Sequence, residues 1–146
     1  MKAIIQRTNQ ASVCVQSKIE AKIGLGIVVF AGIARDDTER QADYLAGRIP
    51  RMRIFEDSEG KMNRDLLEVG GSLLLVSNFT VVADCRKGRR PSFDMAAPPE
   101  RARILFDYLA EGLRRAGVPV QTGVFQAHME VSVVNAGPVT LILESP

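Results

Sequence analysis

The sequence has few of the residues that carry acid–base or metal chemistry in most enzymes. Its 146 residues include one histidine, His128, and two cysteines, Cys14 and Cys85, whose spacing fits no metal or redox site. The nucleophile pattern Gly-x-Ser-x-Gly, the phosphate-loop pattern and the dinucleotide pattern Gly-x-Gly-x-x-Gly are all missing. We therefore expect no metal and no nucleotide cofactor. A Ser-His-Asp triad through His128 stays open, although a lone histidine beside a strand is more often a surface residue.

Long apolar runs are also missing. No stretch approaches the roughly 20 residues that cross a bilayer. Residues 1–7 hold only three consecutive apolar residues after Lys2, which is typical of a strand rather than a signal peptide. We therefore expect a cytoplasmic protein with reduced cysteines. With 46% hydrophobic and 25% charged residues, the composition favours one globular domain spanning 1–146.

Apolar periodicity predicts two helices. The first begins near Thr38, which forms a capping-box pattern with Gln41. It ends before Pro50, because proline disfavours helical geometry in the residue that precedes it. The second helix begins at the prolines 98–99 and stops at Gly117, which provides a C-terminal cap.

Strands are expected before, between and after these helices. They are predicted at 2–7, 26–33, 52–56, 72–76, 120–125, 129–135 and 139–144, with a hairpin between 13 and 23. These are more strands than one sheet with helices on one face needs. The sequence therefore predicts a mixed α/β domain in which two main helices pack on one sheet and further strands form a second layer.

A basic cluster stands out, because the net charge is only +2. Arg86, Lys87, Arg89 and Arg90 place four cations in five positions around Gly88, with no acidic residue among them. The cluster is either a solvated loop or a binding site for phosphate groups, and charge alone favours neither reading.

Two segments rich in small polar groups stand at predicted strand ends. Ser77-Asn78-Phe79-Thr80 follows a buried strand, and Asn135 to Thr140 joins two strands through Gly137-Pro138. Strands hold exposed loops rigidly at such places, where hydroxyls could act as nucleophiles or donors and backbone N–H groups could hold an oxyanion. The alternatives are an ordinary strand end with locally satisfied hydroxyls and a simple β-turn.

Taken with the basic cluster, these segments resemble the D-aminoacyl-tRNA deacylase family. The resemblance runs essentially from Met1 to Glu144, and several long ordered matches make it specific. The matching stretches are 3–7, 53–57, 60–63, 84–93, 96–100 and 135–140.

The resemblance implies a three-layer α/β/β domain that works as a homodimer. It implies hydrolysis of the ester of D-aminoacyl-tRNA, and of glycine mischarged on tRNA, with rejection of L-aminoacyl-tRNA. In the family the Gly-Pro bond of the second motif is cis, and this pair, here Gly137 and Pro138, reaches into the partner subunit's pocket. Arg7 resembles the residue that steadies the pair. Asn135 and Thr140 complete the motif.

The pocket expected from the resemblance departs from the family at two positions. Ser77, Phe79 and Thr80 carry over directly, but Asn78 stands where the family usually has Gln. The shortened arm could lose a hydrogen bond, and an unpaired buried amide costs about 1–3 kcal/mol. Phe125 and Met129 match pocket positions, whereas Gln126 stands where many members have Gly.

The resemblance implies that side chains position the substrate more than they react, with help from the terminal ribose 2′-OH of the tRNA. Thr80 as a covalent nucleophile is the older alternative. Arg86, Lys87, Arg89 and Arg90 become candidates for contacts with tRNA phosphates. A sibling enzyme acting on L-aminoacyl-tRNA, and a non-catalytic module for tRNA binding or dimerisation, remain as competing hypotheses.

Overall fold

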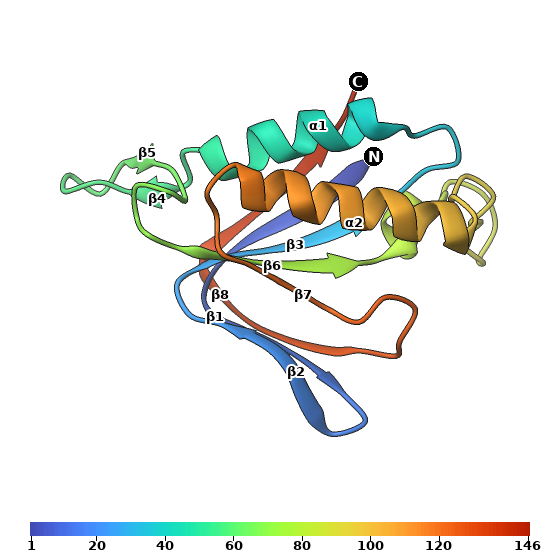
Figure 1. Ribbon diagram of the computed structural model, residues 1–146, viewed down its shortest axis with the longest axis horizontal. Coiled ribbons are helices and arrows are strands. Elements are labelled where there is room, and N and C mark those ends of the chain that lie inside the picture. Colours follow the sequence, from blue (N-terminus) through green and yellow to red (C-terminus); the bar gives the residue numbers. More distant parts are fainter.

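The computed structural model describes all residues, 1–146, as two helices packed over a folded sheet (Figure 1). Neighbouring strands follow the order β2-β1-β3-β6-β7, and β8 pairs with the other edge of β1. Pairing is antiparallel around β1 and parallel where β6 meets β3 and β7, so the sheet is mixed. The strands are β1 (Lys2–Val15), β2 (Lys18–Ile23), β3 (Gly26–Gly32), β6 (Ser72–Ser77), β7 (Val120–Thr122) and β8 (Glu130–Glu144).

Strand β1 is shared between two layers of the fold. Its first half, Lys2–Thr8, pairs with β3, and its second half, Ala11–Val15, pairs with β2. Strand β8 follows β1 through both halves, and the register between them shifts near Arg7. Such irregularities bend strands and increase their twist, so β1 and β8 carry the chain from one layer into the next.

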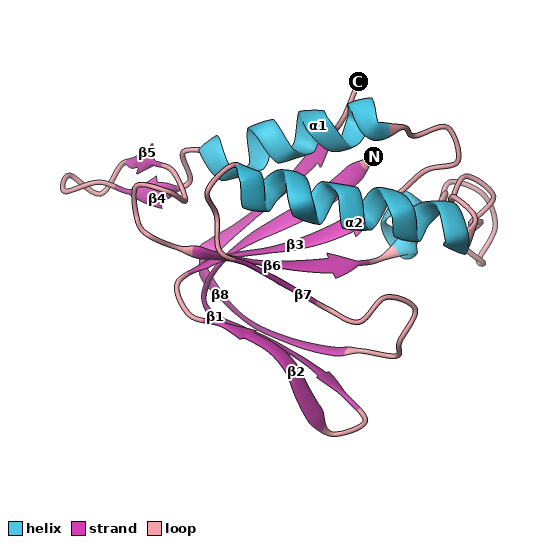
Figure 2. Cartoon of the chain, viewed as in Figure 1, coloured by secondary structure: helices cyan, strands magenta, loops and turns pink.

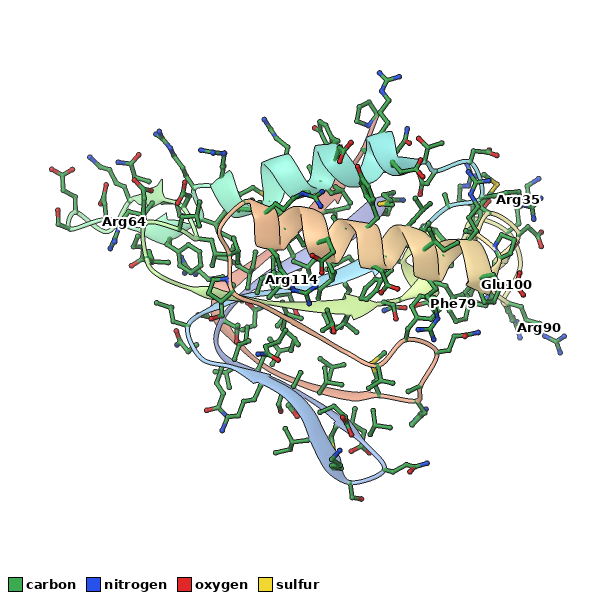
Figure 3. The ribbon with its side chains drawn as sticks, viewed as in Figure 1. Arg35, Arg64, Phe79, Arg90, Glu100 and Arg114 are labelled. Carbon is green, nitrogen blue, oxygen red and sulfur yellow. The ribbon has the colours of Figure 1, made fainter.

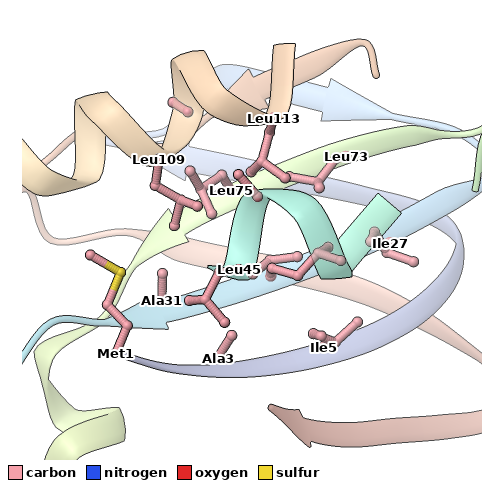
Figure 4. Packing of buried hydrophobic residues seen from close by; sticks show 14 of the residues in the cluster. Met1, Ala3, Ile5, Ile27, Ala31, Leu45, Leu73, Leu75, Leu109 and Leu113 are labelled. Atoms are coloured by element: carbon pink, nitrogen blue, oxygen red, sulfur yellow. The ribbon is translucent and has the colours of Figure 1, made fainter. Parts of the chain in front are cut away.

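The helices α1 (Glu39–Arg48) and α2 (Pro99–Arg115) cover one face of the sheet (Figure 2). The predicted capping box at Thr38 and Gln41 is present, and α1 ends just before Pro50. Leucines from both helices pack on β1, β3 and β6 in the larger apolar core (Figure 4). Neither helix has the length and apolar character of a membrane span.

A second, smaller core lies beneath the sheet. Val28 and Leu74 point away from the helices and pack against Val13 of β1 and Ile23 of β2. Two apolar cores therefore separate three layers: helices, the β3–β6 part of the sheet, and the layer formed by β2 with the bent halves of β1 and β8. The predicted α/β/β architecture is confirmed.

Several strand predictions were wrong in extent: the strand expected at 2–7 continues to Val15, and the one expected at 120–125 ends at Thr122. The strand expected at 52–56 shrinks to β4 (Phe55–Glu56), which forms a small separate hairpin with β5 (Met62–Arg64). The strands expected at 129–135 and 139–144 are one continuous strand, β8. The Gly-Pro pair does not end that strand, because Gln6 pairs with Thr140 and Thr8 with Asn135, so residues 136–139 bulge opposite Arg7 alone. Proline is tolerated at such a bulge, since its missing N–H is not needed there.

Candidate active site

A cavity of about 780 Å³ opens where β6 ends, between the start of α2 and the segment that joins β7 to β8. Figure 3 shows Phe79, Arg90 and Glu100 at this end of the molecule. The cavity contains most of the predicted pocket: the whole Ser77–Thr80 segment together with Phe125 and Met129. Thirteen of its 20 lining residues are hydrophobic, so polar groups there are few and their positions matter.

Strand β6 delivers the Ser77–Thr80 segment to the cavity. Asn78 donates its backbone N–H to Ala31 of β3 at 2.9 Å, and residues 79–82 then turn into a short 3-10 helix. This helix lies against Gly32, where an added Cβ would approach Val81 within 2.9 Å. A glycine in β3 therefore allows the segment to pack closely on the sheet.

The Asn78 side chain caps this short helix. Its Oδ1 accepts hydrogen bonds from the Thr80 N–H at 3.1 Å and from the Thr80 hydroxyl at 2.5 Å. The Asn78 side chain is shorter than the glutamine that the resemblance leads us to expect, but its amide oxygen has hydrogen-bond partners within the turn. The Phe79 N–H is the first amide of the 3-10 helix, where helical geometry offers no acceptor within the helix.

No acid–base group contacts the Thr80 hydroxyl. His128 lines the same cavity, but its ring makes no hydrogen bond to Ser77 or Thr80, and an amide oxygen such as that of Asn78 is not a base. A Ser-His-Asp triad is therefore not formed. The arrangement suits a reaction in which the substrate is already reactive and the site orients it and holds developing charge.

Aromatic rings form the walls of the cavity. Phe79 is 58% exposed, and its ring lies 5.0 Å from that of Phe93 in an edge-to-face arrangement. Phe125 also lines the cavity; its ring centroid lies 5.8 Å from that of Phe106, and the Arg103 guanidinium lies 4.7 Å from the Phe125 centroid. Such faces can stack on a planar group of a ligand.

The Gly137-Pro138 turn lies elsewhere, in the bulge of β8. The bond between the two residues is cis, as the resemblance implies, and both residues are exposed. Arg7, only 8% exposed, donates to the Ala136 carbonyl at 3.1 Å and to the Ile54 carbonyl at 2.7 Å. A Cβ on Gly137 would lie 2.7 Å from Arg7 Nη2, so glycine allows the turn to rest on this guanidinium.

The other two residues of this motif brace the ends of the turn. Asn135 Oδ1 accepts the Val139 N–H at 3.2 Å, and Asn135 Nδ2 donates to Thr140 Oγ1 at 2.9 Å. Hydrogen bonds of side chains that were predicted to bind substrate therefore link the two ends of the bulge.

Within one chain the turn and the cavity do not meet. Arg7 pairs with Ile27 of β3, whereas Ser77 pairs with Ala31, four residues further along, and β6 is three strands from β8. With about 3.3 Å per residue and about 4.8 Å between strands, the separation is on the order of 20 Å. Neither Gly137 nor Pro138 lines the cavity.

The basic cluster lies beside the cavity but is not uniform. Arg86 donates to both oxygens of Asp84, at 2.9 and 2.7 Å, and this pairing holds the pKa of Asp84 well below its usual range. Lys87, Arg89 and Arg90 form no salt bridge. Three cations therefore remain free to attract an anion.

Comparison of the sequence with known proteins identifies its family. A family model described as D-Tyr-tRNA(Tyr) deacylase matches residues 4–144. The chain belongs to this family. A relative from Chlorobaculum tepidum, named D-aminoacyl-tRNA deacylase, is 52% identical over 147 residues. The match covers 100% of this chain and 98% of the relative. A relative of the same name from Pelobacter propionicus is 54% identical over 144 residues, which cover 99% of each chain.

Solved structures show the same fold. One described as c-Myc DNA Unwinding Element Binding Protein has a TM-score of 0.95 and 38% identity, covering 100% of this chain and 99% of that one. Another, described as a probable eukaryotic D-amino acid tRNA deacylase, has a TM-score of 0.84 at 19% identity, with 98% of each chain covered. The predicted family, and with it the class of hydrolase, is confirmed.

Sequence reasoning missed several members of this deacylase-family cavity. Phe93 was read only as part of a matching stretch, yet it lines the cavity, and Arg103 was read only as a residue of the second helix, yet it covers the lining residue Phe125. Aromatic residues near a motif were the available signal for Phe93. No pattern pointed to Arg103, because its role depends on how α2 lies against Phe125.

Proposed function

We propose that the protein hydrolyses the ester of D-aminoacyl-tRNA, and of mischarged glycyl-tRNA, to free amino acid and tRNA. The observation that carries this proposal is a largely apolar cavity with hydroxyl, amide and backbone N–H groups at one end and no general base in contact with them. An aminoacyl ester is already activated, so orientation and oxyanion stabilisation suffice for its hydrolysis.

In the proposed reaction, water attacks the ester carbonyl carbon and the carbonyl oxygen gains negative charge. The Phe79 N–H is the proposed donor to this oxyanion. The ester C–O bond then breaks, the amino acid keeps the oxygen of the water, and the tRNA 3′-oxygen takes a proton. The adjacent ribose 2′-OH assists the transfer. Thr80 positions the segment through its bond to Asn78 and is not the nucleophile.

Selection by chirality is assigned to the Gly137-Pro138 turn of a second copy of the chain. One chain holds the turn on the order of 20 Å from its own cavity, as the strand spacings give. A symmetric dimer could place each turn in the other cavity, where the backbone would leave room for D but not L side chains. Exposed Val134 and Ile142 on β8, an edge strand, support a contact between copies along this strand.

Contacts with tRNA phosphates are assigned to Lys87, Arg89 and Arg90. These cations lie near the cavity, since Phe93 of the same segment forms part of its wall. They would hold the acceptor end of a tRNA largely without regard to its sequence, and the binding would weaken with salt. Arg86 contributes less, because Asp84 neutralises it.

The test is incubation of the purified protein with D-Tyr-tRNA, L-Tyr-tRNA and Gly-tRNA, with release of amino acid measured over time. We expect release of D-tyrosine and glycine, and retention of L-tyrosine on the tRNA. Release of L-tyrosine alone would identify a sibling enzyme of altered chirality. Binding of tRNA without release from any of the three would identify a non-catalytic module.

A further inference from the structure

Gln126, at the edge of the cavity, has a backbone conformation that glutamine rarely adopts. The Ala127 N–H donates to the Val124 carbonyl at 3.2 Å, which closes a four-residue turn. Gln126 occupies the third position of this turn with φ of 64°. That position, with positive φ, favours glycine or asparagine, so glutamine is disfavoured there unless its side chain has a use.

Folding gives no reason for glutamine at this position. Its side chain is exposed and forms no hydrogen bond within the chain, although it lines the cavity. The other non-glycine residues with positive φ, Gln16 and Ser17, form the two-residue connection between β1 and β2. Tight hairpins require positive φ at both such positions, whereas Gln126 belongs to no hairpin.

The neighbouring residue holds the turn in place. Phe125 packs against Phe106 of α2, and the guanidinium of Arg103 lies over its ring, 4.7 Å from the centroid. These contacts oppose movement of the first central residue of the turn. Gln126 is thus held at the cavity by a rigid aromatic anchor, with a free amide that can both donate and accept.

We propose that the Gln126 carboxamide reads the edge of the adenine at the 3′ end of the tRNA, and is a specificity-determining residue of this protein. The inference rests on the proposed function. Glutamine amides recognise adenine by accepting from its 6-amino group and donating to a ring nitrogen. The exposed rings of Phe79 and Phe93, which line the same cavity as Gln126, offer faces on which a base can stack, so that its edge meets the rim of the cavity.

The experiment compares wild type and Gln126→Gly on two tRNAs charged with D-tyrosine. One ends in adenosine and the other in purine riboside, which lacks only the 6-amino group. For wild type we expect the loss of this group to raise KM about three- to tenfold, the value of one neutral hydrogen bond, with kcat unchanged. Gln126→Gly should have the raised KM on adenosine-ended tRNA and should not respond to the amino group.

Two controls separate this role from a structural one. Gln126→Gly should not lower the Tm, since glycine is favoured at this φ. Gln16→Gly changes the same residue type at φ of 49°, in the β1–β2 turn, and should leave both KM values as in wild type. Equal sensitivity of wild type and Gln126→Gly to the amino group, or a fall in kcat alone, would overturn the proposal.

Binding of the two uncharged tRNAs is measured in parallel. If the wild type released no D-tyrosine, the proposed function would fail, but the role of Gln126 would still be decided by these affinities. A preference for the adenosine-ended tRNA that disappears in Gln126→Gly supports the inference. A preference that persists in the variant rejects it.

Discussion

The strand-end segment Ser77–Thr80 and the Gly137-Pro138 turn differ in how the fold uses them. The first follows a buried central strand and lines a cavity whose other walls come from the same chain. The second bulges from an edge strand, rests on a buried arginine and is exposed to solvent. The first segment is thus part of a concave site. The second is an exposed turn that lines no part of that cavity.

In the proposed function, each chain therefore carries two separate halves of a site. Rigid elements position both halves, as a site that selects by shape requires, but the sheet keeps them apart. The proposed function therefore depends on a second copy.

The largest effect is expected from Arg7→Ala. The buried guanidinium bonds two backbone carbonyls, of Ala136 and Ile54, and its removal leaves them unpaired. We expect a loss of about 2–4 kcal/mol in the free energy of unfolding, as for other broken buried charged contacts, and release of tyrosine from L-Tyr-tRNA. Urea unfolding measures the first effect and the deacylation assay the second.

Glu56→Gln is the matched control for Arg7→Ala. Glu56 lies 3.6 Å from Arg7 Nη2, but its side chain is 59% exposed. An exposed ion pair contributes about 1 kcal/mol or less, so this variant should unfold close to wild type. If Arg7→Ala were equally mild, the arginine would not be the support of the turn.

Pro138→Ala should damage chiral rejection more than folding. Because Pro138 is exposed, its ring packs little within its own chain. We expect a change below about 1 kcal/mol in stability, as for most surface substitutions, but at least about a tenfold rise in hydrolysis of L-Tyr-tRNA. Complete sparing of L-aminoacyl esters by this variant would show that the turn does not select by chirality.

Mixing two variants tests whether the turn acts across the dimer. Ala102→Trp fills the cavity from α2 and leaves the turn intact, whereas Pro138→Ala leaves the cavity intact. When Pro138→Ala is refolded together with a tenfold excess of Ala102→Trp, most Pro138→Ala chains should pair with an Ala102→Trp chain. The Ala102→Trp chain then supplies an intact turn. The release of L-tyrosine by Pro138→Ala chains should then fall about tenfold, as random pairing in a two-fold dimer gives. Unchanged release would place the turn's action within one chain.

The sequence predicted elements whose cues are local. The capping box at Thr38, the stop before Pro50 and the apolar run of β6 each depend on neighbouring residues. The strand predicted at 52–56 was wrong because only Phe55 and Glu56 pair with β5, with a register shift between them. The continuity of β8 could not be read from Gly137-Pro138, since it depends on Arg7 standing opposite the bulge.

The same limit applies to the candidate site. Its motif residues came from resemblance, and the structure brings the Ser77–Thr80 segment together with Phe125 and Met129. That Asp84 neutralises Arg86, and that Arg103 covers Phe125, required geometry. Contacts made by long side chains are set by how elements pack, and spacing along the sequence does not encode them directly.

A smaller effect is expected from Thr80→Val, which changes the segment that lines the cavity. The substitution removes the hydroxyl that donates to Asn78 and keeps the shape of the side chain. If Thr80 only positions the segment, kcat for D-Tyr-tRNA should fall less than about tenfold, the value of one hydrogen bond. A covalent nucleophile would instead cost several orders of magnitude. Single-turnover kinetics with the charged tRNA separates the two outcomes.

The smallest effect is expected in the basic cluster, where paired and unpaired cations can be compared. Arg89→Ala with Arg90→Ala should reduce the slope of log affinity against log salt by about 1.5, because two phosphate contacts are lost. Arg86→Ala should change the slope little, since Asp84 already pairs with this arginine and no phosphate contact is lost. Filter binding of tRNA at several salt concentrations measures both. Equal slopes for the two variants would mean that the cluster is solvated and that the acceptor end of the tRNA lies elsewhere.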